Sequence, residues 1–297
     1  MNYTITGSLG HISKPIVTKL ISGGHNVTVI TSSSNKTSEI EKLGAKAAVG
    51  SVNDPLFLKK AFAGSDAVYL MLPTDYSVTD LFTAQKLVAD NYLNAVKANN
   101  IKHIVLLSSI GANLRKGAGP IDGLGYMEEQ LEKLTEVNVK ALRPSYFYYN
   151  LHAMAGLIKQ SDIAGASFGS DSEKLVLTHT DDIAEVAADH LLSLNFKGFT
   201  IQHIASDERF TKDIATVLGS AVGKPNIPWI IFTDEQAKEG MANAGLGITF
   251  IEAYVQMNKA LREGVLQADY WKNKPTTLGK VKLEDFAKDF AANYAKI

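Results

Sequence analysis

The sequence predicts an α/β fold, in which a doubly wound parallel sheet is joined to a smaller, mostly helical lobe in the C-terminal part. Short apolar runs of strand length alternate with longer segments whose apolar residues recur at helical spacing. This alternation is typical of βαβ units. A turn that contains two glycines directly follows the first run. The 297 residues, 45% of them hydrophobic, are enough for one such unit with a smaller companion.

The first half of the chain carries the clearest alternation. Five strands are expected at 2–6, 26–31, 46–50, 67–72 and 103–108. Four helices are expected between them, at 14–24, 37–44, 54–64 and 79–100. Because strands joined through helices run parallel, these segments predict a parallel sheet.

The second half extends the sheet and adds the smaller lobe. Two further strands are expected at 139–144 and 199–206, with a helix at 181–194 that begins at Asp181 or Asp182 as N-cap. A helix at 145–159 and further helices from about 211 to the end are expected to cover the carboxyl edge of the sheet. We expect the larger domain over 1–144, with 175–205 returning to its sheet, and the smaller substrate lobe over 145–174 and 206–297.

Composition excludes several classes of function. Thirty basic and thirty-one acidic residues give a net charge of −1 without a basic stripe, so no nucleic acid partner is expected. The absence of cysteine excludes disulfides and thiolate metal sites and favours a cytoplasmic location. The seven histidines lack the close spacing of metal ligands, so no metal is expected. No membrane span or signal peptide is expected either.

The turn at 6–13, "TGSLGHIS", has the features of a phosphate-binding loop at the start of a Rossmann-type domain. Gly7 would permit the tight turn, and Gly10 would let the backbone approach a pyrophosphate. Backbone amides around 9–12 would face the negative charge at a helix N-terminus. Ser13 replaces the usual third glycine and affects helix packing more than phosphate contact. The alternative is a glycine turn that joins strand to helix and binds nothing.

The end of the second expected strand bears on the choice between NAD and NADP. An acidic residue there would bind the ribose 2′-hydroxyl of NAD, whereas this chain has Ser32, Ser33 and Lys36 and no carboxylate before Glu39. Hydroxyl groups with one cation suit a phosphate, so NADP (NADPH) is favoured over NAD. The alternative is a serine-rich loop that only caps the next helix.

Three segments together resemble the NmrA-like family of atypical short-chain dehydrogenases/reductases. They are the glycine turn, "LLSSIGA" at 106–112, and "EEQLEKLTEVNVKALRPSYFYYNL" at 128–151. The resemblance spans nearly the whole chain. Its nearest branches are bacterial NAD(P)H:quinone oxidoreductases, triphenylmethane reductases and redox-sensing regulators.

The resemblance implies a set of cofactor-binding residues. The pyrophosphate would be wrapped by six residues: Gly7, Ser8, Leu9, Gly10, His11 and Ile12. The nicotinamide side would be lined by two short segments: Leu72, Pro73 and Thr74, and Ser108 and Ser109. Ser32 stands where the family commonly has an arginine that meets a 2′-phosphate. Glu129 stands at the glutamate that usually precedes the "LRP" motif.

The customary acid–base residues are absent. Ser109 is placed for the serine of the Tyr-x-x-x-Lys mechanism, but four residues after Tyr126 stands Gln130 instead of lysine. Gly125 occupies the position at which some relatives have an acid–base lysine. Ser109 and Tyr126 therefore stay weak catalytic candidates, and sugar-nucleotide epimerase chemistry loses its support. Hydride transfer to a quinone needs no such base, because the cofactor carries the chemistry.

The aromatic segment after the sixth strand is the candidate substrate pocket. Its proposed walls are Tyr146, Phe147, Tyr148, Tyr149 and Asn150. Aromatic faces suit a flat acceptor, with Asn150 as an orienting hydrogen-bonding group. The alternative is a core cluster that holds the small lobe in place.

Two functions follow from these residues. The first is an NAD(P)H-dependent oxidoreductase that reduces a small aromatic acceptor such as a quinone by direct hydride transfer. The second is a non-catalytic, NADP-sensing regulatory protein that acts on a protein partner.

Overall fold

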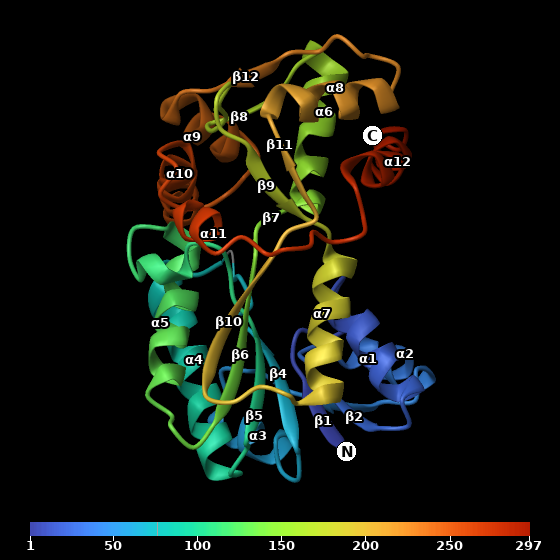
Figure 1. Cartoon of the computed structure of the whole chain (residues 1–297), viewed down its shortest axis with the longest axis vertical. Helices are drawn as coiled ribbons and strands as arrows, with labels where there is room; N and C mark the ends of the chain where they lie inside the picture. The colour runs from blue at the N-terminus through green and yellow to red at the C-terminus, as the bar shows by residue number, and fades with distance from the viewer. Residues whose placement is uncertain (76) are drawn as a thin grey trace.

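The computed structural model of the chain describes residues 1–75 and 77–297. Figure 1 shows two stacked lobes, with the main sheet and its covering helices in the lower one and the C-terminal helices in the upper one. No helix within the described residues is both long and apolar enough to cross a membrane.

The larger lobe is built on a seven-stranded sheet in the order β10-β6-β5-β4-β1-β2-β3, and all its strand pairs are parallel. Its strands are β1 (Asn2–Ile5), β2 (Asn26–Thr31), β3 (Lys46–Val49), β4 (Ala67–Met71), β5 (His103–Leu107), β6 (Asn138–Pro144) and β10 (Phe199–Ile204). The strand order reverses between β1 and β4, which is the place where doubly wound sheets bind ligands. The predicted doubly wound α/β fold is confirmed.

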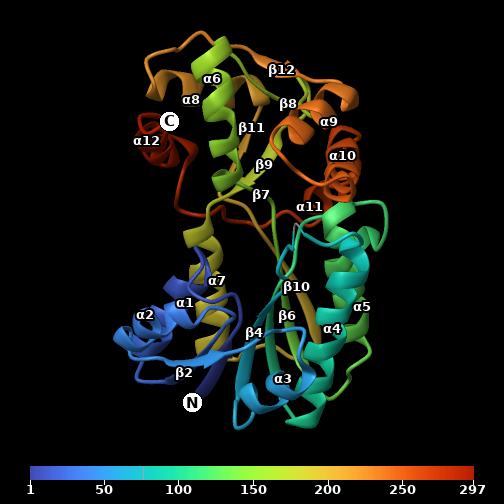
Figure 2. The same ribbon diagram turned by 180° about the vertical axis from the view of Figure 1, so that it is seen from behind.

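Helices cover both faces of this sheet. One face carries α1 (Ser13–Ser22), α2 (Thr37–Lys42) and α7 (Thr180–Ser193), and the other carries α3 (Pro55–Ala61), α4 (Leu81–Ala98) and α5 (Asp122–Glu132). Figure 2 shows the same two groups from behind. Each group packs on the sheet through its own cluster of buried apolar side chains, so the strands are apolar on both faces.

The start of α7 differs from the prediction. Its N-cap is His179, whose Nδ1 accepts a hydrogen bond from the Asp181 amide at 3.1 Å. Asp182 is buried and accepts hydrogen bonds from Ser206 Oγ at 2.6 Å and from the Lys280 amide at 2.9 Å. The prediction of Asp181 or Asp182 as N-cap is therefore wrong. His179 caps the helix, and Asp182 binds the segments around Ser206 and Lys280 instead.

The smaller lobe combines helices with two short sheets. Its helices are α6 (Ala155–Ser161), α8 (Thr211–Ala221), α9 (Asp234–Asn243), α10 (Ile248–Arg262), α11 (Ala268–Lys272) and α12 (Leu283–Tyr294). One sheet orders β11 (Asp207–Arg209), β9 (Leu175–Thr178) and β7 (Tyr146–Phe147), and the other pairs β12 (Trp229–Ile231) with β8 (Ala164–Ala166).

Two expectations for this lobe are wrong. The helix expected at 145–159 is strand β7, then a 3₁₀ segment over Tyr148–Met154, and only then α6. β7 is a strand because it pairs with β9, which supplies hydrogen bonds that a helix would otherwise have to make internally. Because β9 pairs with β7 and β11, it lies in a separate sheet and not in the main one. The chain therefore returns to the larger lobe with α7, after residue 178, and not at residue 175.

Candidate cofactor and acceptor site

The turn after β1 has the backbone shape that its glycines predict. Gly7 has φ of +88°, a conformation that favours glycine, and Ser8 follows at +55°. A Cβ built on Gly10 would meet only the Gly7 carbonyl oxygen, at 3.3 Å, so this face of the turn is otherwise open. A ligand can therefore approach the backbone at Gly10.

Two amides of the turn are paired, Ser8 with the Ile30 carbonyl oxygen at 3.1 Å and Gly10 with the Gly7 carbonyl oxygen at 3.2 Å. Within the described chain, the N–H groups of Leu9, His11 and Ile12 donate no hydrogen bond. They stand directly before α1, where an anion is favoured by the helix dipole. Unpaired donors at this point suit the oxygens of a pyrophosphate.

Ser13 takes over the packing role of the third glycine. It is buried, and its Oγ donates a hydrogen bond to the Thr6 carbonyl oxygen at 3.0 Å. The same Oγ lies 2.7 Å from the position that a Cβ on Gly7 would occupy. The serine thus joins α1 to the end of β1 and leaves the phosphate-facing side of the turn unchanged.

The loop after β2 carries a small charged group. Ser32 is exposed, and Thr31 Oγ1 accepts hydrogen bonds from Ser8 Oγ at 3.1 Å and from the Ser33 amide at 3.2 Å. Beyond it, Glu39 pairs with both Lys14 and Lys36, each at 3.1 Å. These two sets of contacts bring the loop against the glycine turn.

The cluster of Lys14, Lys36 and Glu39 is positive on balance. Hydrogen bonds, first from Lys14 and then from Lys36, lower the pKa of Glu39, so its carboxylate is ionised at neutral pH. Two ammonium groups and one carboxylate leave one net positive charge beside the exposed serines.

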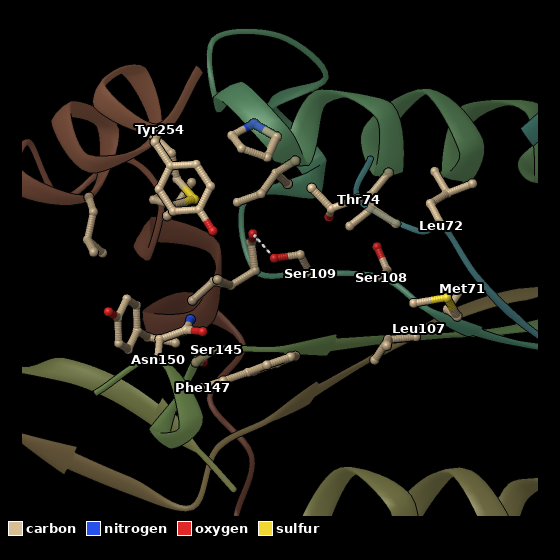
Figure 3. Close-up of a pocket in the computed structure, with 18 of the residues that line it drawn as sticks. Met71, Leu72, Thr74, Leu107, Ser108, Ser109, Ser145, Phe147, Asn150 and Tyr254 are labelled. Atoms are coloured by element: carbon tan, nitrogen blue, oxygen red, sulfur yellow. Dashed lines mark hydrogen bonds between the residues drawn. The ribbon is translucent and has the colours of Figure 1, made fainter. Parts of the chain in front are cut away.

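A pocket of about 260 Å³ lies between the carboxyl ends of the strands and the smaller lobe (Figure 3). Its volume is close to the lower end of small-molecule sites, roughly 300 Å³. Its described lining is Met71, Leu72, Thr74, Gln85, Leu107, Ser108, Ser109, Ile110, Pro120, Ile121, Leu124, Ser145, Tyr146, Phe147, Asn150, Tyr254, Met257, Leu261, Leu266 and Gln267. None of these residues carries a charge.

Most of the predicted nicotinamide and acceptor residues meet in this pocket. They are Leu72, Thr74, Ser108, Ser109, Tyr146, Phe147 and Asn150. Pro73 is not among the lining residues. The prediction for Tyr148 is wrong: it is fully buried, and its ring stacks on Phe286 at 5.4 Å in the core of the smaller lobe.

Tyr149 and His11 connect the two lobes. The Tyr149 ring is about half exposed (51%) and lies 4.6 Å from the His11 ring of the glycine turn. Tyr149 is not among the pocket-lining residues. The residues of the aromatic segment therefore lie in three different places. Tyr146 and Phe147 line the pocket, Tyr148 lies in the core of the smaller lobe, and Tyr149 contacts the glycine turn.

Several lining residues were missed in the sequence. Tyr254, Met257 and Leu261 lie on α10 at helical spacing and form one wall. That stripe is visible in the sequence, but spacing alone does not tell which neighbour a helix face meets. Ser145 directly follows β6, and Gln85 is buried on α4; neither position carries a local signal of a pocket.

A buried ion pair lies behind Ser108, one of the pocket-lining residues. Ser108 Oγ donates to Glu128 Oε1 at 2.6 Å, and Arg143 binds both oxygens of the same carboxylate, at 3.0 and 2.5 Å. Glu128 is fully buried, whereas Glu129 is half exposed and pairs with Lys133. Glu128, and not the neighbouring Glu129, is therefore the glutamate in contact with Ser108 and Arg143.

Arg143 also connects the pocket to the smaller lobe. Its Nη1 donates to Asp269 Oδ2 at 2.8 Å, and His203 Nε2 lies 2.9 Å from the same oxygen. Burial alone would lower the pKa of Arg143, but the hydrogen bond and charge of Glu128 raise it, so the guanidinium stays charged. The pair fixes β6, α5 and α11 relative to one another.

Tyr126 stands away from the pocket. Its hydroxyl donates to Asp90 Oδ1 at 2.7 Å, and the Lys86 ammonium lies over its ring. Burial and the contact with Asp90 raise the pKa of Tyr126 to about 12, so it stays protonated at neutral pH. These contacts argue against Tyr126 as a general base.

The other acid–base positions offer no replacement. Ser109 lines the pocket, but its hydroxyl donates to the Ile110 carbonyl oxygen at 2.9 Å. A side chain at Gly125 would meet the Ala112 carbonyl oxygen at 2.7 Å, so a lysine has no room there. Among the described residues, no group of three or more metal-ligating side chains is present.

The family model described as NAD(P)H-binding matches residues 7–193, more than half of the chain. The chain belongs to the NAD(P)H-binding family. The match begins at Gly7 and covers the glycine turn, the loop after β2 and the ion pair behind Ser108. It identifies the broad family and leaves the NmrA-like branch a prediction.

Individual relatives of this NAD(P)H-binding protein are distant in sequence and similar in fold. The NAD(P)H azoreductase of Xenophilus azovorans is 24% identical over 98% of each chain. The NADPH-dependent quinone oxidoreductase of Escherichia coli, solved with NADPH, has a TM-score of 0.80 at 17% identity over 97% of this chain and 99% of the other. The triphenylmethane reductase of Citrobacter sp., solved with NADP(H), has a TM-score of 0.76 at 18% identity over 97% and 99%.

The residues present fit the nucleotide that names the family. The unpaired amides of Leu9, His11 and Ile12 suit a pyrophosphate, and the open face of Gly10 gives it room. An uncharged pocket begins beside them, since Met71 both lines it and lies 3.1 Å from a Cβ position on Gly7. The turn and the pocket are therefore neighbours.

Proposed function

We propose that this protein is an NADPH-dependent reductase that transfers a hydride to a small, flat aromatic acceptor such as a quinone. The observation that carries this proposal is the uncharged pocket of about 260 Å³ that opens beside the glycine turn. Its aromatic and aliphatic walls suit a flat ring, and its position suits a nicotinamide whose pyrophosphate lies on the turn.

In this proposal the larger lobe, including α7 and β10, binds the nucleotide. The smaller lobe, over 145–178 and 206–297, supplies the acceptor side. When bound, the reduced nicotinamide supplies a hydride, and the acceptor takes one proton from water, which yields hydroquinone and the oxidised nucleotide. The protein's part is to hold a flat acceptor between Phe147 and the Tyr254 wall while keeping water out.

The relatives support this class of reaction. The proteins named above are an azoreductase, a quinone oxidoreductase and a triphenylmethane reductase, and all three names denote reductases of aromatic compounds. The geometry of Tyr126 also supports it, since this tyrosine, the sequence candidate for the base of epimerase chemistry, donates to Asp90 and does not line the pocket.

The test is NADPH oxidation by the purified chain with a quinone, an azo dye and a triphenylmethane dye. We expect loss of NADPH absorbance with at least the quinone. Measurable NADPH binding without turnover of any acceptor would overturn the reductase and favour the NADP-sensing alternative, which acts through a protein partner. A folded protein that binds neither nucleotide would overturn both.

We further propose that the cofactor is NADP(H) and that its 2′-phosphate lies at Ser32, Ser33 and Lys36. The support is the net positive charge of the cluster of Lys14, Lys36 and Glu39, and the absence of a carboxylate at the end of β2. Lys14, on α1, is the second cation of this cluster.

Replacing Lys36 with alanine should raise the KM for NADPH about fivefold and leave the KM for NADH nearly unchanged, because only NADPH carries the phosphate. Glu39→Gln should do the opposite and increase the preference for NADPH about threefold, since it releases both lysines. Both effects should shrink at high salt. The measurement is KM for each cofactor at two ionic strengths.

Lys42→Ala is the matched control, because Lys42 is exposed at the end of α2, the helix that begins directly after Lys36, and makes no ion pair within the described chain. Equal effects of Lys36→Ala on NADPH and NADH would show that Lys36 does not meet the 2′-phosphate.

A further inference from the structure

Three serines line the pocket, and they differ in what their hydroxyl protons do. Ser108 donates to Glu128 Oε1 and Ser109 donates to the Ile110 carbonyl oxygen. Ser145 Oγ is buried and has no hydrogen-bond partner within the described residues. Ser145 is therefore the serine whose proton is free for a ligand.

The backbone of Ser145 is held rigidly. Its amide donates to Thr178 Oγ1 at 3.0 Å and to the Ile204 carbonyl oxygen at 3.2 Å. Thr178 in turn donates to the same Ile204 carbonyl oxygen at 2.7 Å. A donor on a backbone fixed at the end of β6 loses little conformational freedom when it binds a ligand.

Figure 3 shows Ser145 beside Phe147 and Asn150, below Ser109 and Tyr254 in this view. A buried hydroxyl without a hydrogen-bond partner lowers the stability of the folded protein. At a pocket wall, a ligand that accepts a hydrogen bond from this hydroxyl removes that cost. The pocket lacks charged residues among those described, and a cationic ligand would lose its hydration without a carboxylate in exchange.

We infer that the Ser145 hydroxyl donates the hydrogen bond that anchors a carbonyl oxygen of a neutral aromatic acceptor. This rests on the proposed reductase function and narrows its substrate class: neutral, carbonyl-bearing aromatics bind at this wall, and cationic dyes without a carbonyl bind less well. Phe147 next to it supplies an aromatic face for the ring of the same acceptor.

The test uses the full chain loaded with NADP⁺, so that binding is measured without turnover. The probes are menadione, a neutral quinone, and malachite green, a cationic triphenylmethane dye, each titrated by calorimetry. Ser145→Ala should raise the Kd for menadione about fivefold and leave the Kd for malachite green within about twofold. Wild type should bind menadione more tightly than the dye.

Two controls separate binding from folding. Ser220→Ala, on the exposed side of α8, should leave both Kd values unchanged. The Tm of Ser145→Ala should be unchanged or higher by about 2 °C, because the variant removes an unpartnered buried hydroxyl. A fall in Tm would indicate a structural role and overturn the inference.

The remaining outcomes distinguish the two proposals. Unchanged menadione binding by Ser145→Ala, or equal weakening of both ligands, overturns the role of Ser145 and leaves the reductase intact if wild type turns over quinone. Weakened menadione binding without any turnover supports Ser145 as a ligand anchor and overturns the reductase. No menadione binding by NADP⁺-loaded wild type overturns both.

Discussion

Glu128→Ala is expected to lower the free energy of unfolding by about 3–5 kcal/mol, because it leaves Arg143 charged, buried and without its main partner. For a chain of this size, such a loss lowers Tm by roughly 10 °C. The Ser108 hydroxyl loses its acceptor in the same variant, so the nicotinamide side of the pocket is disturbed as well. Thermal unfolding of the two proteins measures the effect.

The neighbouring residue is a matched control for this prediction. Glu129→Ala removes a half-exposed carboxylate that pairs with Lys133, and it should change stability by no more than about 0.5 kcal/mol. The double variant Glu128→Leu with Arg143→Met removes both charges and should be less destabilised than the sum of the single variants. Equal effects of Glu128→Ala and Glu129→Ala would contradict the assignment of the buried pair.

Gly10→Val is expected to weaken NADPH binding at least about 100-fold while the protein stays folded. The new side chain would occupy the open face of the turn, where we propose that the pyrophosphate approaches the backbone. Hydrogen bonds to a charged group contribute about 1.5–3 kcal/mol each, so the loss of two of the contacts from Leu9, His11 and Ile12 accounts for this magnitude. Calorimetric titration with NADPH measures it.

Gly240→Val is the control for this variant, since Gly240 lies on the exposed helix α9 and a Cβ there meets nothing within 4 Å. It should leave NADPH affinity unchanged. If Gly10→Val binds NADPH as tightly as wild type, with an unchanged Tm, the pyrophosphate does not lie over this turn.

The parts of the fold that depend on local pattern were predictable. All seven strands of the main sheet were expected within about two residues of their observed bounds. Continuous apolar runs indicate strands that are buried on both faces of a parallel sheet, and the helical spacing of apolar residues between them indicates the covering helices. The glycine turn was equally local, since Gly7 needs a conformation that favours glycine and Gly10 needs an absent side chain.

Errors arose where a distant partner decides the local structure. Residues 146–147 became a strand because β9, about thirty residues later, pairs with them. Glu128 could have been recognised from its own segment: it shares a helical stripe with Leu124 and Leu131, so it faces the core, whereas Glu129 does not. A glutamate on an apolar stripe implies a buried cation, and only the folded chain shows that the cation is Arg143.

For this protein, the alternation of strand-length and helical apolar patterns predicted the doubly wound sheet, and two glycines predicted the shape of the turn after β1, because both depend on residues close together in the chain. The acceptor pocket was decided by the tertiary structure, since its walls come from β4, β5, β7 and α10, which are far apart in sequence. Ser108 is paired with Glu128 on α5, whereas Ser145 is buried without a partner among the described residues, and such differences arise only when residues distant in sequence come together in the fold.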